Sequence, residues 1–188
     1  SGATRRDGVG EFPMGTSLRE VIDEVGWGVE PGTEIVAVLS GTANPIISPS
    51  LLDTPLTYED MAAAGTGLGS AGFIVYDGRT DPVAIAAGVS RFLAVESCGQ
   101  CEPCKRDGLV LADLLGTLHE GRLTEAQFDD AQRRVETVAI GARCNLARQQ
   151  EAVVGSLLRL FPDLVRSRMA GAAGDSAVVE VVPIATMV

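Results

Sequence analysis

The sequence predicts an α+β protein, with a small mixed module over residues 1–80 and an all-α helical bundle over residues 81–169. Three observations predict this class. Short β-branched runs alternate with capped helical runs in the first module, whereas apolar residues recur every three or four positions in the second. The charge balance also changes, from 4 basic and 12 acidic residues over 1–90 to 11 of each over 91–170. A chain of 188 residues is long enough for two small cores.

The first module is expected to hold two short helices and two strands. Ser17-Leu18-Arg19-Glu20 has the form of a capping box, which predicts a helix that ends at Gly26 or Gly28. Residues 34–39 are rich in β-branched side chains and lie between turn residues, so they predict a mostly buried strand. The remaining expected elements are a helix capped by Thr57 and a strand over residues 73–76.

The second module is expected to hold five helices. Asp81 can cap the first of them, and Pro82 suits its first position. Gly121 is expected to end the second helix, and Thr124 with Gln127 forms another capping box. The expected spans are 81 to about 97, about 105 to 119, 124 to about 141, about 146 to 160, and 162–169.

Residues 170–188 are expected to be a linker followed by a tail. The linker, residues 170–174, contains only alanine and glycine. From Ala177 onward the sequence is apolar and β-prone, with no partner strand in view. We therefore expect the tail to dock on another surface or to continue into a longer chain.

Composition argues against several classes of partner. The chain has 15 Lys and Arg against 25 Asp and Glu, a net charge of −10 and an isoelectric point near 4.5. Nucleic-acid binding needs clustered basic residues, so no nucleic-acid partner is expected. No stretch approaches the ~18 apolar residues of a membrane helix, and the start of the chain does not read as a secretory leader. We expect no direct membrane insertion and a cytoplasmic location.

The candidate site consists of the chain's four cysteines. Cys98, Cys101 and Cys104 are separated by two-residue spacers, and Cys144 stands alone. Three thiolates at this spacing can hold three corners of a [4Fe–4S] cluster, and a remote cysteine can hold the fourth. Helix N-termini near the cysteines would favour the negative charge of such a cluster. Two alternatives stay open: zinc, whose structural sites usually use two separated cysteine pairs, and two disulfides.

Three other features have simpler structural interpretations. Residues 67–72, Gly-Leu-Gly-Ser-Ala-Gly, match the glycine pattern of dinucleotide-binding loops, but the expected helix precedes them and the expected strand follows. His119 is expected at a helix end, where a basic side chain complements the dipole. Lys105 and Arg106 either face solvent or stabilise the reduced state of a cluster, and the sequence leaves both possibilities open.

Residues 96–104, Glu-Ser-Cys-Gly-Gln-Cys-Glu-Pro-Cys, resemble a known family signature. It is that of the flavoprotein subunit of NADH:quinone oxidoreductase (complex I) and of its relatives in NAD-linked hydrogenases and formate dehydrogenases. Cys144, about forty residues further on, also resembles the family's fourth cysteine in its spacing. The similarity covers roughly residues 8–168, and segments 13–20, 53–58 and 64–72 resemble the family's soluble-ligand-binding β-grasp (SLBB) module.

The resemblance implies a ubiquitin-like β-grasp domain followed by a helical domain with one [4Fe–4S] cluster on Cys98, Cys101, Cys104 and Cys144. In the family, this cluster accepts electrons from FMN that NADH has reduced. The family's FMN- and NADH-binding domain has no counterpart here, so no FMN or NAD site is expected within this chain. The implied partners are a flavin- and NADH-binding domain or subunit and a further iron-sulfur subunit. Residues 145–148 depart from the family's usual sequence, which bears on the partner surface beside the cluster.

The sequence therefore favours an electron-transfer module of an NADH dehydrogenase-like oxidoreductase that is not catalytic alone. The alternative is a non-redox adaptor whose metal site, zinc or iron-sulfur, only staples the helical domain. A cluster that bleaches on reduction separates the two interpretations.

Overall fold

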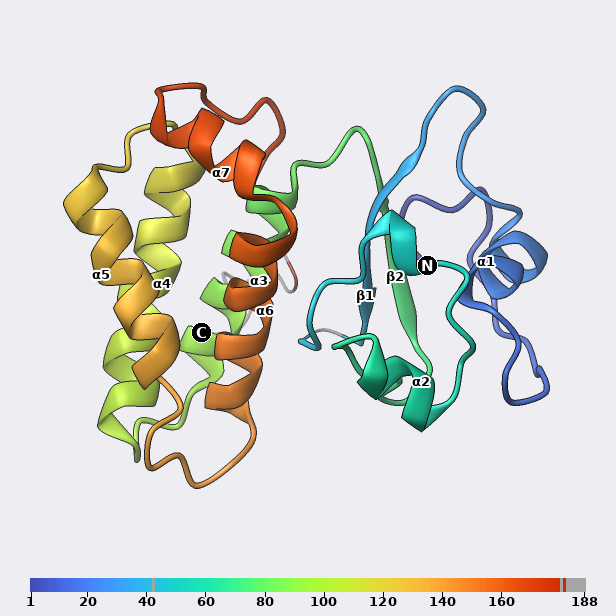
Figure 1. Cartoon of the computed structure of the whole chain (residues 1–188), viewed down its shortest axis with the longest axis horizontal. Helices are drawn as coiled ribbons and strands as arrows, with labels where there is room; N and C mark the ends of the chain where they lie inside the picture. The colour runs from blue at the N-terminus through green and yellow to red at the C-terminus, as the bar shows by residue number, and fades with distance from the viewer. Residues whose placement is uncertain (42, 180, 182–188) are drawn as a thin grey trace. The chain divides into compact units, whose positions relative to one another are not determined.

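The computed structural model describes residues 1–41, 43–179 and 181 (Figure 1). The chain divides into two compact units, Ser1–Thr80 and Asp81–Val188. The first contains short helices with a small antiparallel sheet, and the second contains helices alone among its described residues. The α+β class is thus confirmed.

The N-terminal unit forms around one sheet of two strands. Strand β1 (Ile35–Ser40) pairs antiparallel with β2 (Phe73–Asp77), with a register irregularity between Ile35 and Ala37. Isolated bridges, such as Val38 to Ile47 and Gly2 to Val75, extend the pairing beyond the two strands. The regular sheet in the described part of this unit is therefore smaller than the β-grasp resemblance suggests. Its other elements are α1 (Leu18–Gly26), the 3₁₀ turn η1 (Pro49–Leu51) and α2 (Tyr58–Ala63).

Local capping chemistry starts both helices of this unit. The Ser17 hydroxyl accepts a hydrogen bond from the Glu20 amide, and the Glu20 carboxylate accepts one from the Ser17 amide, which completes the predicted capping box. The Thr57 hydroxyl caps α2 in the same way, through the Asp60 amide. The helices then bury their apolar faces against the sheet in one core: Leu18, Ile22, Val38, Ile47, Leu52, Leu56, Met61, Leu68 and Val75.

The second unit is a helical bundle with its most apolar helix at the centre. Helix α3 packs against both α4 and α6, and ten of its fifteen residues are buried. Apolar side chains on nearly every side of α3 explain this position, because only a central helix can bury all of them. The helices are α3 (Pro82–Glu96), α4 (Glu102–His119), α5 (Glu125–Thr137), α6 (Leu146–Leu160) and α7 (Pro162–Met169).

The helix order brings two distant connections to one end of the bundle. In Figure 1 the turn between α3 and α4 and the connection between α5 and α6 lie at the same end, and α7 lies at the other. The alternation of chain direction causes this, since α3 and α5 both run towards that end. Residues about forty positions apart in sequence therefore become neighbours. We call this the cysteine end, because residues 97–104 and 138–145 form it.

Two helix boundaries differ from expectation at this end. Helix α4 begins at Glu102 instead of residue 105, because Pro103 fits the first helical turn and an acidic residue favours a helix N-terminus. Helix α5 ends at Thr137 instead of near Gly141. Buried Val138 anchors the chain there, and the following residues fold into tight turns closed by the Ile140 and Ala142 amides.

Buried charges close the opposite end of the bundle. The Asp81 carboxylate caps α3 through the Val83 amide at 2.8 Å, and it also contacts Arg168 at 2.8 Å and His119 at 3.2 Å. The other ring nitrogen of His119 lies 2.7 Å from the Ser176 carbonyl oxygen. Both ring nitrogens thus lie within hydrogen-bond distance of oxygen atoms. His119 does end α4 as predicted, but no pattern in the sequence indicated this buried network.

The start of the tail lies along α3. The Gly174 amide donates to the His119 carbonyl at 2.7 Å, and the Val179 amide donates to the Ala84 carbonyl at 3.3 Å. The predicted β-prone tail lies mostly outside the described residues, because residues 180 and 182–188 are not among them. No helix in the described chain combines the length and apolarity that crossing a bilayer requires.

Candidate metal centre

All four cysteines line one pocket at the cysteine end. Its volume is about 210 Å³, and both connections contribute to its wall. Cys98 follows the C-terminus of α3, Cys101 is the N-cap of α4, and Cys104 lies in the first turn of α4. Cys144 comes from the α5–α6 connection, two residues before α6 begins. Two sequence segments, one with three cysteines and one with a single cysteine, thus meet at one hollow.

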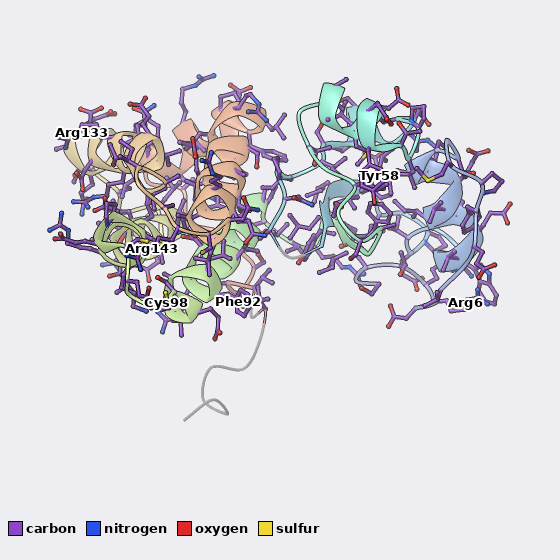
Figure 2. The ribbon with its side chains drawn as sticks, turned by 90° about the horizontal axis from the view of Figure 1, so that it is seen from below. Arg6, Tyr58, Phe92, Cys98, Arg133 and Arg143 are labelled. Carbon is purple, nitrogen blue, oxygen red and sulfur yellow. The ribbon has the colours of Figure 1, made fainter. Side chains whose placement is uncertain are left out.

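The four cysteines of the pocket differ in their exposure to solvent. Cys104 is buried, at 8% exposure, Cys101 is intermediate, and Cys98 and Cys144 are exposed. The hollow therefore has its floor at Cys104 and opens beside Cys98 and Cys144. Figure 2 views this end from below, with Cys98 and Arg143 labelled. The other lining residues are Ser97, Gln100, Ala142, Arg143, Leu146 and Ala147, of which Arg143 alone carries a formal charge.

The four cysteines line a hollow that has room between them. All four cysteines are free thiols, so the structure contains neither disulfide that the sequence left open. Among the residues that the structure describes, no three His, Cys, Asp or Glu side chains are arranged around one metal position. The share of liquid volume taken by one water is about 30 Å³, so a 210 Å³ pocket has room for an occupant of several atoms. The donor set of four soft sulfurs suits iron-sulfur or zinc chemistry.

Helix α4 presents its positive end to the pocket. Its first turn contains Cys104, and the amides of a helix's first turn have no intrahelical acceptor. They favour nearby negative charge, such as that of a thiolate-ligated group. The Ser97 hydroxyl lies 3.4 Å from the Cys104 sulfur, within the range of a weak hydrogen bond to sulfur. The local sequence thus supplies electrostatic support as well as candidate ligands.

Lys105 and Arg106 point to different surroundings. The Lys105 ammonium donates to three carbonyl oxygens at the end of α3, those of Ala94, Val95 and Ser97, at 2.8, 3.1 and 3.1 Å. Arg106 is exposed and pairs with Glu102 at 2.8 Å. Arg106 therefore faces solvent, whereas Lys105 is only partly exposed. Stabilisation of the reduced state of a cluster by either residue stays a prediction.

Arg143 joins the two connections across the pocket. Its guanidinium donates to the side-chain oxygen of Gln100 at 2.9 Å. Gln100 lies within the cysteine triplet and Arg143 directly precedes Cys144, so this bond spans both sequence segments. Sequence reasoning missed the pairing, because nothing in either segment indicates its partner.

An ion-pair network fixes α5 against α4 behind the pocket. Arg134 pairs with Asp130 on its own helix at 2.7 Å and also contacts Asp107 on α4. The hydrogen bond that Arg134 donates to Asp130 is the main cause of the raised pKa of the Arg134 guanidinium. In the structure Asp107 is buried, and this network helps to place the connection that carries Cys144.

The glycine pattern at residues 67–72 serves as a turn. Helix α2 precedes it and β2 follows, as expected from the sequence. Gly67 and Gly69 pack against the Asn44 side chain, and the Gly72 carbonyl accepts the Gly41 amide at 2.6 Å. Gly69 has a φ of 56°, which favours glycine. The glycines thus permit close packing of loops, and no helix follows them to bind a phosphate.

A second hollow lies within the N-terminal unit. Its volume is about 370 Å³, larger than the cysteine pocket, and its lining includes Thr4, Val25 and Phe73. The charged groups in its lining are Arg6 and the amino group of Ser1. Size alone does not indicate chemistry, whereas four converging sulfurs do. The cysteine pocket is therefore the candidate site.

Comparisons with known proteins match the helical unit to an iron-sulfur binding region. Residues 84–168 match the model of the NADH-ubiquinone oxidoreductase-F iron-sulfur binding region. This range covers most of α3 and nearly all of the bundle, including both cysteine segments. The match identifies an iron-sulfur binding region from a pattern that includes the whole helical context of the cysteines.

Several curated relatives are similar over much of the chain. The F 2 subunit of NADH-quinone oxidoreductase in Rhizobium meliloti is 42% identical over 58% of this chain and 26% of its own length. The corresponding F subunit of Aquifex aeolicus is 32% identical over 87% of this chain and 37% of its own length. The HndC subunit of the NADP-reducing hydrogenase of Solidesulfovibrio fructosivorans is 31% identical over 86% and 33%. The chain thus spans a quarter to two fifths of the length of these relatives.

The fold has a close counterpart among solved structures. A chain of the NAD⁺-reducing [NiFe]-hydrogenase in its H₂-reduced state matches with a TM-score of 0.77 and 26% sequence identity. The match covers 89% of this chain and 28% of the hydrogenase chain, so it includes residues from both units. The chain therefore belongs to the family of the iron-sulfur-binding part of NADH-quinone oxidoreductase F subunits and their hydrogenase relatives.

Proposed function

We propose that this chain is an electron-transfer module that holds one [4Fe–4S] cluster on Cys98, Cys101, Cys104 and Cys144. The observation that carries the proposal is the convergence of all four cysteines on one pocket of about 210 Å³. A cubane needs four ligands around a volume of several atoms, and the pocket offers both. The triplet-plus-one spacing favours this cluster over zinc, for which the sequence offers no two separated pairs.

The chain's own residues would hold the cluster and tune it. Cys104 would bind its most buried corner, and Cys98 and Cys144 its exposed edge. The first-turn amides of α4 would stabilise its negative charge, and Leu146 with Ala147 would exclude water from one side. Such a cluster supplies reversible one-electron transfer, with a potential set by its charge, its hydrogen bonds and its exposure. An exposed edge beside a buried floor suits a carrier, because a redox partner can approach one side.

The place of the module in a larger system is also a proposal. Relatives of this chain are named as subunits of NADH-quinone oxidoreductases and of a hydrogenase, which supports protein partners in general. We propose that flavin and NADH chemistry lies in a separate domain or subunit, with no FMN or NAD site in this chain. The electron acceptor would be a further iron-sulfur subunit. Free thiols fit a reducing compartment, so we place the protein in the cytoplasm.

The first experiment measures iron, zinc and acid-labile sulfide on anaerobically purified protein, with spectra before and after dithionite. About four iron and four sulfide per chain, with bleaching near 400 nm, are expected for one redox-active [4Fe–4S] cluster. About one zinc with no sulfide, and failure of reconstitution with iron and sulfide, would instead support the non-redox adaptor.

A ligand variant tests the fourth corner. Cys144→Ser should lower the iron content to about three per chain or fewer, because it removes the single ligand on the second segment. Asn145→Ser is a matched control, since Asn145 is an exposed neighbour whose side chain makes no capping bond to α6. Full iron content and an unchanged spectrum in Cys144→Ser would remove Cys144 from the ligand set.

A further inference from the structure

The carbonyl end of α3 lies beside the cysteine triplet. Helix α3 ends at Glu96, and its C-cap Ser97 is followed directly by Cys98. The last carbonyls of a helix carry partial negative charge, equivalent in total to about half an electron. A thiolate-ligated cluster is also negative, so this helix end would disfavour it. Something must compensate these carbonyls for the site to hold an anionic group.

Lys105 supplies that compensation. Its ammonium donates to the carbonyls of Ala94, Val95 and Ser97, with all three N–O distances between 2.8 and 3.1 Å. All three donors of the ammonium are thus directed at one helix terminus. Lys105 lies in the first turn of α4, and its amide bonds the Cys101 carbonyl at 3.1 Å. One residue therefore ties the end of α3 to the start of α4, on either side of the cysteine triplet.

We propose that Lys105 is a positioning residue of the cluster site. It holds the Ser97 carbonyl, and with it the backbone that enters Cys98, and it cancels the negative end of α3 beside the four sulfurs. This inference rests on the proposed cluster. It gives Lys105 two separable effects: its donors hold the loop, and its charge raises the reduction potential by stabilising the added electron.

Three substitutions separate these effects. Lys105→Arg keeps the charge and N–H donors, Lys105→Gln keeps two N–H donors without the charge, and Lys105→Met keeps the stem with neither. Arg106→Gln is the matched control, because Arg106 is the next residue and its charge pairs with exposed Glu102. The measurements, on the reconstituted 188-residue chain, are the rate of iron release to a chelator and the midpoint potential of the cluster.

Iron release should be about tenfold faster in Lys105→Met, intermediate in Lys105→Gln, and near wild type in Lys105→Arg. The midpoint potential should fall in Lys105→Gln and Lys105→Met and stay unchanged in Lys105→Arg and Arg106→Gln. If Lys105 only held the loop, Lys105→Gln would change the rate of iron release but not the midpoint potential of the cluster.

Two outcomes would overturn the inference. In one, Lys105→Met and Arg106→Gln behave alike in release rate and potential. In the other, the metal-free Lys105→Met protein shows no faster hydrogen exchange at the Ser97 amide than metal-free wild type. The exchange measurement needs no cluster. Failure of the proposed function would appear separately, as wild-type protein that binds no iron and sulfide.

Discussion

The two ends of the helical bundle are closed by different chemistry. At one end, the buried Asp81 carboxylate lies 2.8 Å from Arg168 and 3.2 Å from His119. At the other end, four free thiols line a pocket, and the bonds that cross between the two connections include the exposed Arg143–Gln100 pair. Figure 1 shows these ends at opposite extremes of α3 and α4.

This difference shows how one bundle can combine a fixed end with a cofactor end. The charged end satisfies its groups with the chain's own side chains, so its stability depends on amino acids alone. The cysteine end gathers four free thiols. A metal group bound there would supply further cross-links between the two connections.

Removal of the metal should affect one end only. Extraction of a reconstituted cluster with an iron chelator should increase hydrogen exchange in residues 97–105 and 138–146 by about tenfold or more, because ligation couples to local folding. The ends of α3 and α4 near Asp81 and His119 should keep their protection. Mass spectrometry of exchanged peptides measures both regions in one sample. Equal loss of protection at both ends would contradict the contrast.

Loss of Asp81 should damage the opposite end. Asp81→Asn leaves Arg168 buried without its counter-ion, which should cost about 3 kcal/mol of the helical unit's stability in urea unfolding. The exposed Arg166–Asp163 pair on α7 provides the control, since Arg166→Gln should change stability by about 0.5 kcal/mol or less. If Asp81→Asn and Arg166→Gln unfold at similar urea concentrations, the buried network does not stabilise the helical unit.

The N-terminal unit should respond to acid through Asp77. The Asp77 side chain is 1% exposed, and the hydrogen bond from Arg79 is the main cause of its lowered pKa, below the ordinary value of 3.8. A lowered folded-state pKa stabilises the unit above pH 3.8, and this stabilisation is lost as the pH falls through the folded value.

Asp77→Asn should therefore cost about 1 kcal/mol at pH 7, a value kept small because Arg79 is largely exposed. The difference from wild type should shrink at pH 3, and urea midpoints at both pH values measure it. A difference that is independent of pH would rule out the carboxylate as its source.

The Arg143–Gln100 bond should have the smallest effect. Both side chains are exposed, so Arg143→Gln should speed iron release by about twofold or less. Arg148→Gln, at an exposed position in the first turn of α6, controls for the loss of one positive charge. An effect of tenfold or more from Arg143→Gln alone would make this bond a main closure of the pocket.

Local signals in the sequence were sufficient for most elements. The capping boxes at Ser17 and Thr124 placed two helix starts correctly, because their hydrogen bonds form within four residues. The spans of α6 and α7 also agree with the apolar spacing and with Pro162. Helix α4 starts earlier than predicted, since the apolar pattern that located it begins only after the cysteine triplet.

The sequence was enough to predict which residues would carry the chemistry, because two-residue spacers and a remote cysteine make a ligand pattern that needs no coordinates. It also determined the order of a mixed unit and a helical unit. Which other side chains lie beside the cysteines depends on the tertiary structure. Lys105 and Arg106 are adjacent in sequence, and Arg143 and Gln100 are 43 positions apart. Whether two such groups meet depends on how α3, α4 and the α5–α6 connection pack, and that packing arises from apolar contacts spread over the whole bundle.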